Sequence, residues 1–121
     1  MTSQDAPAYP LVRRAGLNGM LVSFAGSLSE ASNRAALAYR SAVDALALEG
    51  VAETMASLAS VFVRFDPSVL PHALLEAKLQ ELLAARDWTR AALPAGRRFW
   101  RVPTVYGTDL APQLAEAADA A

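Results

Sequence analysis

Residues 57–68, SLASVFVRFDPS, decide how the chain folds. Val61, Val63 and Phe65 occupy alternate positions, as expected for a β-strand with one buried face. Asp66-Pro67 ends this strand, because proline cannot donate a hydrogen bond to a neighbouring strand. The segment therefore predicts a core strand that stops abruptly.

A helix is expected directly after the strand. Pro71 suits the first turn of a helix, where its missing N–H costs nothing. Between Pro71 and about Arg86, leucines at helical spacing form one apolar stripe against charged and polar neighbours. The stripe consists of Leu75, Leu79 and Leu82.

The residues before this segment predict two further strands and another helix. Met20–Phe24 is an apolar run with the length of a buried strand, and residues 51–57 alternate in the manner of a second strand. Ser27 and Glu30 have the spacing of a helix N-terminal capping box. Gly50 stands where a left-handed helix C-terminal cap would lie.

The C-terminal part contains one more extended segment. Residues 97–107, RRFWRVPTVYG, follow a loop and predict a last strand, with Pro103 confined to an edge. The resulting order is strand, helix, strand, strand, helix, strand. We therefore expect an α+β fold, a two-layer βαββαβ ferredoxin-like sandwich with two helices on one face of a four-stranded antiparallel sheet.

Composition restricts the possible functions. The 121 residues are 54% hydrophobic and 19% charged with a net charge of −1, which gives the whole molecule no attraction to nucleic acid. Cysteine is absent, which excludes disulfides and fits a reducing compartment. No secretion signal or membrane span is apparent, so we expect a cytoplasmic protein that binds neither membrane nor nucleic acid.

No catalytic or cofactor constellation stands out. His72 is the single histidine, and we interpret it as an exposed structural residue rather than a catalytic base. One histidine without cysteine offers no metal site, and no phosphate-binding glycine loop is present. Residues 62–65 match the end of an RNA-recognition signature, but its preceding aromatic and glycine positions are not met. We predict no catalytic residue, no metal and no cofactor of the chain's own.

Surface residues are more informative than candidate catalysts. The sheet face opposite the helices should carry large apolar groups, and such a cluster indicates an interaction surface. Phe62, Arg64 and Trp100 are the candidate interface residues. Arginines 97, 98 and 101 surround Phe99 and Trp100, and the simplest interpretation of this group is a solvated strand edge.

Three motifs in order carry a family resemblance. They are GMLVSFAGSLSEASNRAALAYRSAV, GVAETMASLASVFVRFDP and WRVPTVYG. Over roughly residues 9–116 the chain resembles the amino-terminal half of the family that contains the PxpB subunit of 5-oxoprolinase, allophanate hydrolase subunit 1 and the kinase inhibitor KipI. After Tyr106 the sequence departs from the family pattern Tyr-Gly-Gly-Glu, because Thr108 and Asp109 follow Gly107.

The resemblance implies a domain organisation. Residues 1–17 would be a lead-in and residues 18–105 the α+β domain. Residues 106–121 would begin a linker to a cyclophilin-like domain that these 121 residues do not include.

The resemblance also implies two alternative functions. In the first, the chain is an inert domain of a hydrolase subunit in an ATP-dependent complex that cleaves 5-oxoproline or urea-derived allophanate. The partners would be a second carboxyltransferase-like subunit and a LamB/YcsF-type subunit, and ATP would be bound only by a partner subunit. In the second, the chain is a KipI-like module that inhibits a histidine kinase by protein contact.

Overall fold

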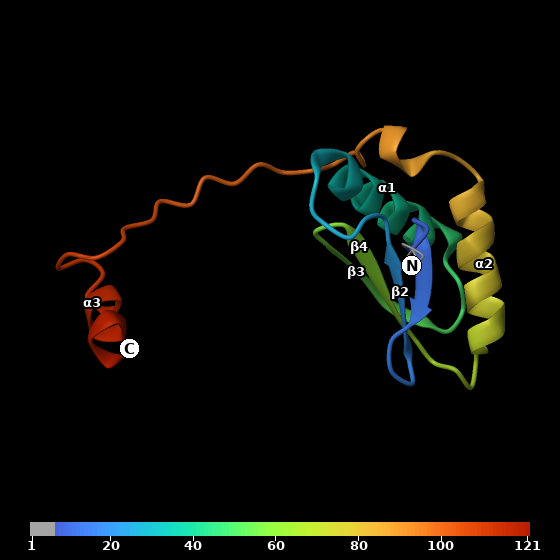
Figure 1. Cartoon of the computed structure of the whole chain (residues 1–121), viewed down its shortest axis with the longest axis horizontal. Coiled ribbons are helices and arrows are strands. Elements are labelled where there is room, and N and C mark those ends of the chain that lie inside the picture. Colours follow the sequence, from blue (N-terminus) through green and yellow to red (C-terminus); the bar gives the residue numbers. More distant parts are fainter. Residues whose placement is uncertain (1–6) are drawn as a thin grey trace, which may run out of the picture.

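The structure, a computed structural model, describes residues 7–121, in which a sheet packed against helices is followed by an extended C-terminal segment (Figure 1). The helices and strands, in chain order, are β1 (Leu11–Arg14), β2 (Gly19–Ser23), α1 (Glu30–Leu46), β3 (Val51–Ser57), β4 (Ser60–Phe65), α2 (His72–Ala84), the 3₁₀ turn η1 (Trp88–Arg90) and α3 (Gln113–Ala120).

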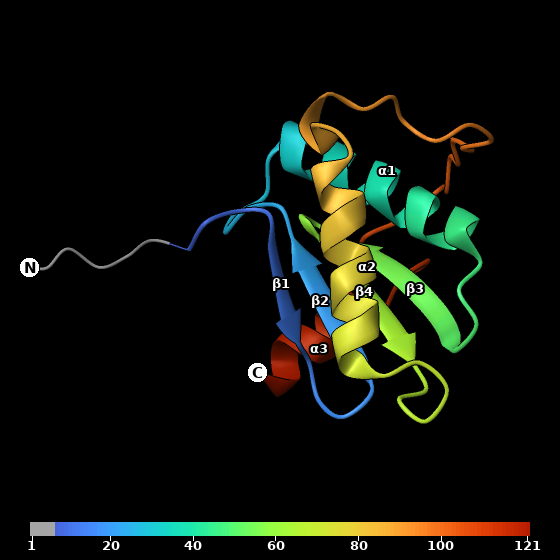
Figure 2. The same ribbon diagram turned by 90° about the vertical axis from the view of Figure 1, so that its right-hand side faces the viewer.

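The expected fold class is confirmed, but the fourth strand comes from the N-terminal part of the chain and not from residues 97–107. The four strands form an antiparallel sheet in the order β1-β2-β4-β3, and α1 and α2 cover one face of it (Figure 2). The prediction of a last strand over residues 97–107 was wrong, because the edge beside β2 is occupied by β1. The element order is therefore ββαββα, followed by α3.

A local hairpin explains why β1 takes this edge. The β1–β2 connection is only four residues long, and Gly16 has the positive φ of 71° that such a turn needs. Closing so short a loop costs less entropy than bringing in a strand from residues 97–107. Since β1 lies within the expected lead-in of residues 1–17, the folded domain begins earlier than residue 18.

The ends of α1 differ from the sequence prediction. The N-cap is Ser29, whose hydroxyl accepts from the Ser32 N–H at 3.1 Å, while the Ser32 hydroxyl accepts from the Ser29 N–H at 2.9 Å. This capping box uses two serines instead of the predicted Ser27 and Glu30. The left-handed C-cap is Ala47, whereas Gly50, with φ of 99°, lies in the turn before β3.

Strand β3 contains a β-bulge that its alternating sequence did not reveal. Val51 pairs with Phe65 and Glu53 pairs with Arg64, so Ala52 has no partner of its own. An extra residue of this kind reverses the alternation. Thr54 is consequently buried beneath α1, while Glu53 and Met55 lie on the opposite face.

Helix α2 and the aromatic core hold the helical layer together. Leu75 and Leu79 are buried as expected, and Leu83 completes the stripe in place of Leu82. The Tyr39 ring is fully buried between Phe24 and Trp88, with centroid distances of 5.4 and 5.2 Å. Its hydroxyl donates to the carbonyl of Leu79 at 2.8 Å and so joins α1 to α2.

The C-terminal segment leaves the domain on the side of the sheet away from α2. Figure 2 shows α2 in front of the sheet and α3 behind it, and Figure 1 shows the long connection between domain and α3. None of the residues of α3 is buried. The sheet face opposite α1 and α2 is therefore not covered by a helix of the described residues.

Candidate functional site

The candidate site is the sheet face opposite α1 and α2, called the free face below. Strand alternation and pairing register assign eleven residues to it. They are Leu11, Arg13, Gly19, Leu21, Ser23, Glu53, Met55, Ser57, Ser60, Phe62 and Arg64. Three of the four strands contribute an apolar side chain to its middle.

An apolar row crosses the centre of the free face. Leu21 on β2 is the register partner of Phe62 on β4, which is in turn the partner of Met55 on β3. Met55 is 48% exposed, and Leu21 and Phe62 are half-buried. At the β1 end the row continues with Arg13, the register partner of Leu21. The row therefore forms an apolar strip with a basic end.

Phe62 owes its position to a glycine in the neighbouring strand. A Cβ atom built on Gly19 would lie 2.6 Å from two ring carbons of Phe62 and 2.5 Å from the carbonyl oxygen of Ala15. The ring therefore lies over the backbone of Gly19, which is buried for this reason. Close contact of an aromatic ring with a strand glycine fixes the ring on the sheet surface.

Arg64 is paired rather than free. Its Nε donates to Oε1 of Glu53 at 2.8 Å across the β3–β4 pair, and both side chains are nearly half exposed. An exposed pair of this kind contributes little to stability. The two charges instead provide a polar rim beside the apolar row.

A shallow hollow of about 340 Å³ extends the apolar row toward the β3–β4 turn. Leu21, Leu28 and Leu58 contribute apolar walls, and serines 27, 57 and 60 contribute polar ones. Leu28 and Leu58 are 57% and 63% exposed. Leu58 has a positive φ of 53°, a conformation that leucine adopts only at a cost, and its carbonyl accepts from Asn33 Nδ2 at 2.8 Å.

The structure brings together two of the three predicted interface residues. Phe62 and Arg64 both lie on the free face, whereas Trp100 lies in the extended C-terminal segment and is 72% exposed. Leu21 and Met55 were not singled out from the sequence. The alternation around Met20 and Val22 could have identified Leu21, but Met55 depended on the bulge in β3.

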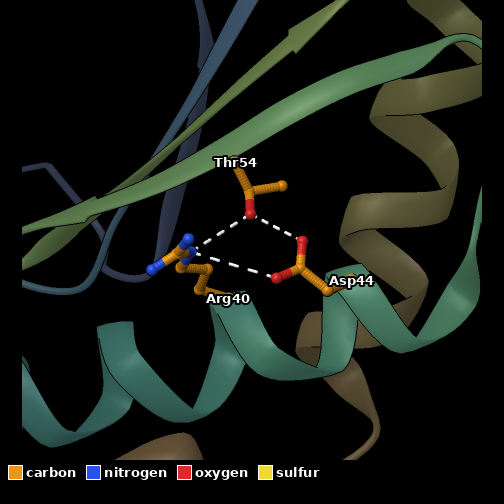
Figure 3. Close-up of polar contacts among 3 residues, drawn as sticks. All are labelled: Arg40, Asp44 and Thr54. Atoms are coloured by element: carbon orange, nitrogen blue, oxygen red, sulfur yellow. Dashed lines mark hydrogen bonds and ion pairs between the residues drawn. The ribbon is translucent and has the colours of Figure 1, made fainter.

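A polar cluster on the helix side has a structural role (Figure 3). Thr54 Oγ1 donates to Asp44 Oδ1 at 2.6 Å and accepts from Arg40 Nε at 3.2 Å, and Arg40 Nε lies 4.0 Å from Asp44 Oδ2. Thr54 is 6% exposed, so α1 provides the hydrogen bonds that its buried hydroxyl requires. The cluster fastens β3 to α1.

The single histidine and the acidic side chains form no recognisable catalytic or metal-binding group within residues 7–121. His72 is half-buried, with its ring edge-on to Phe65 at 4.9 Å, so it is less exposed than expected. Within residues 7–121, no group of three or more histidine, cysteine, aspartate and glutamate side chains is placed to hold a metal ion. In the same range, no helix has the length and apolar character required to cross a membrane.

Two solved structures are similar to part of the chain. Protein PH0987 of Pyrococcus horikoshii, titled a conserved uncharacterized protein, superimposes with a TM-score of 0.59 and 24% identity over 61% of this chain and 34% of PH0987. The chain thus spans about a third of that relative. Urea carboxylase of Kluyveromyces lactis matches with a TM-score of 0.49 and 22% identity over 59% of this chain and 6% of the enzyme. None of the curated proteins compared with the chain matches it.

The sequence profile of one protein family covers nearly the whole chain. The family is described as carboxyltransferase domain, subdomain C and D, and its profile matches residues 10–121. This match agrees with the three sequence motifs and includes all the elements of the fold. The chain therefore belongs to the carboxyltransferase domain, subdomain C and D, family.

Proposed function

We propose that the chain is a non-catalytic part of a hydrolase subunit that resembles PxpB of 5-oxoprolinase or allophanate hydrolase subunit 1. It would contribute to a complex that hydrolyses 5-oxoproline or allophanate with ATP. The family match over residues 10–121 is the observation that carries the proposal.

The free face is the proposed contact surface for the other subunits. Leu21, Phe62 and Met55 form its apolar centre, and Arg64 with Glu53 forms part of its rim. Apolar centres with polar rims are the usual anatomy of protein interfaces. In this proposal the partners are the second carboxyltransferase-like subunit and the LamB/YcsF-type subunit, and ATP is bound by a partner subunit.

Reconstitution tests this function. The chain is combined with the second carboxyltransferase-like subunit and the LamB/YcsF-type subunit of the same genome. ATP hydrolysis is then measured with 5-oxoproline, with allophanate and without substrate. We expect substrate-dependent hydrolysis that falls when the chain is left out. Equal rates with and without the chain would refute the proposal.

A KipI-like regulatory role is the second candidate, and the apolar row on the free face favours it. A four-stranded sheet with an apolar row can receive the apolar stripe of a partner helix, such as the dimerisation helices of a histidine kinase. This role predicts slower kinase autophosphorylation when the chain is added. It also predicts no substrate-dependent ATP hydrolysis in the reconstituted mixture.

A further inference from the structure

A hollow of about 220 Å³ lies at the end of the domain where the chain enters β1 and where α2 is followed by η1. Its apolar walls include the side chains of Tyr9, Phe24, Leu83 and Trp88. Pockets for drug-sized ligands typically measure about 300–1,000 Å³, so this one suits a smaller molecule. The lining includes no residue of the free face and no residue after Thr89, so the hollow is separate from the free face and from the extended C-terminal segment.

Arg86 gives this hollow a positive charge that no acidic side chain of residues 7–121 pairs with. Its guanidinium carbon lies over the Trp88 ring, 5.0 Å from the ring centre. The ring is itself held in place, because Trp88 is buried and its indole N–H donates to the carbonyl of Leu82 at 3.2 Å. A guanidinium placed over an aromatic ring keeps N–H groups that can still donate to an anion.

Asp87 also lines the hollow, but its carboxylate is already engaged. Oδ1 accepts from the backbone N–H of Thr89 at 3.1 Å and from the Thr89 hydroxyl at 2.6 Å, and Oδ2 lies 3.8 Å from Arg90 Nε. The charge of Arg86 therefore stays available for a ligand. A multiply charged anion such as phosphate would meet this one cation together with the negative charge of Asp87, so a single negative charge fits better.

From these contacts we infer that the hollow binds a small organic monocarboxylate with an apolar ring or branched body. The planar guanidinium of Arg86 would form a bidentate pair with the two carboxylate oxygens. The apolar walls would remove the rest of the ligand from water, as is usual for concave binding sites.

The inference does not depend on the proposed function, which concerns the free face. By its chemistry 5-oxoproline belongs to the inferred class, because it is a small lactam ring with one carboxylate. Benzoate is a second member, whose flat ring matches the aromatic walls. The two acids together test the class without any assumption about the reaction of the complex.

NMR titration of the isotope-labelled full chain tests the site. The chain has two tryptophans, so two indole N–H signals report on Trp88 in the hollow and on Trp100 outside it. The Trp100→Phe variant assigns the two signals. We expect at least one of the two acids to move the Trp88 signal with a Kd on the order of 1 mM or below, while the Trp100 signal stays in place. The neutral amides, benzamide and 5-oxoprolinamide, should bind at least about tenfold more weakly.

A charge-matched pair of variants makes the test specific. Arg86→Gln removes the free charge and should weaken binding of the acid at least about tenfold. Arg98→Gln removes the same charge from the extended segment and should leave the Kd unchanged. The amide spectrum of each variant shows whether it is folded. The comparison of acids with amides tests the same contact on the wild type, where folding is not in question.

Several results would overturn the inference. One is a Trp88 signal that neither acid moves, and another is equal binding of the acids and their amides or of the wild type and folded Arg86→Gln. Inorganic phosphate that binds as tightly as the acids would indicate a nonspecific anion site. Tighter binding of acetyl-glycyl-leucine would assign the hollow to the C-terminus of a peptide instead. Failure of the reconstituted ATP hydrolysis would not affect these results, because the titration contains no partner subunit.

Discussion

At the scale of single residues, β4 places two phenylalanines in opposite environments. Phe65 is 2% exposed and lies in the core between the sheet and the helices, whereas Phe62 is half-buried on the free face. The same strand therefore contains a core residue and a surface residue of identical chemistry. Substitutions of these two residues can therefore distinguish an effect on stability from an effect on binding.

Alanine substitution of the two phenylalanines should give unequal losses of stability. Phe65→Ala leaves a cavity in the core and should lower the free energy of unfolding by about 3–5 kcal/mol. Phe62→Ala loses only the contact with Gly19 and its row neighbours and should cost about 1 kcal/mol. Urea denaturation measures both, and equal losses would mean that Phe62 belongs to the core.

At the scale of elements, hydrogen bonds from buried hydroxyls connect the layers. Thr54 links β3 to α1, and Tyr39 links α1 to α2. Both hydroxyls are buried, and each has a partner in another element. Their removal should loosen the helical layer without changing the free face.

Thr54→Val tests the first link. The substitution keeps the shape of the side chain but removes the hydroxyl between Arg40 and Asp44, so the free energy of unfolding should fall by about 1 kcal/mol. Thr104→Val in the exposed C-terminal segment is the matched control and should have no effect. If the two variants are equally stable, the cluster does not fasten β3 to α1.

The second link predicts a dependence on pH. Burial raises the pKa of Tyr39 well above its ordinary value of 10.0, because the core disfavours the phenolate. The unfolded chain therefore ionises this hydroxyl first, and the free energy of unfolding should fall as the pH rises above about 10.

Tyr39→Phe removes this contribution to the pH dependence. The variant should lose about 1 kcal/mol at neutral pH, where the hydrogen bond to Leu79 is lost. Its free energy of unfolding should then fall less steeply than that of the wild type above a pH of about 10. Parallel curves for the two proteins in thermal or urea denaturation would show that Tyr39 does not determine the alkaline limb.

At the scale of the whole molecule, the sequence predicts the sheet and helix layers better than it predicts which strand forms the edge of the sheet. The strand at 60–65, both helices and the face on which Phe62 lies follow from alternation and helical spacing. The hairpin partner of β2 does not, because Val12 is the single buried residue of a four-residue strand and gives no periodic signal. Residues 97–107 have the composition of a strand, but strand pairing depends on the whole sheet.

Part of the candidate site could also be predicted from the alternation of residues along a strand. Phe62 and Arg64 lie on β4, whose alternation the sequence shows, so the expectation of a common face was correct. The expectation that Trp100 lies beside them depended on a strand over residues 97–107 in the same sheet, which the structure does not contain. Trp100 instead lies exposed on the extended segment that follows the domain.

Binding of the reconstituted partner tests the central claim that the free face is an interface. The affinity of the chain for the second carboxyltransferase-like subunit of its own genome is measured by isothermal titration calorimetry, with the wild type and with Phe62→Ala. We predict that the variant stays folded and binds at least about tenfold more weakly, as expected at the centre of an interface. Undiminished affinity of a folded Phe62→Ala variant, or no binding by the wild type, would contradict this claim.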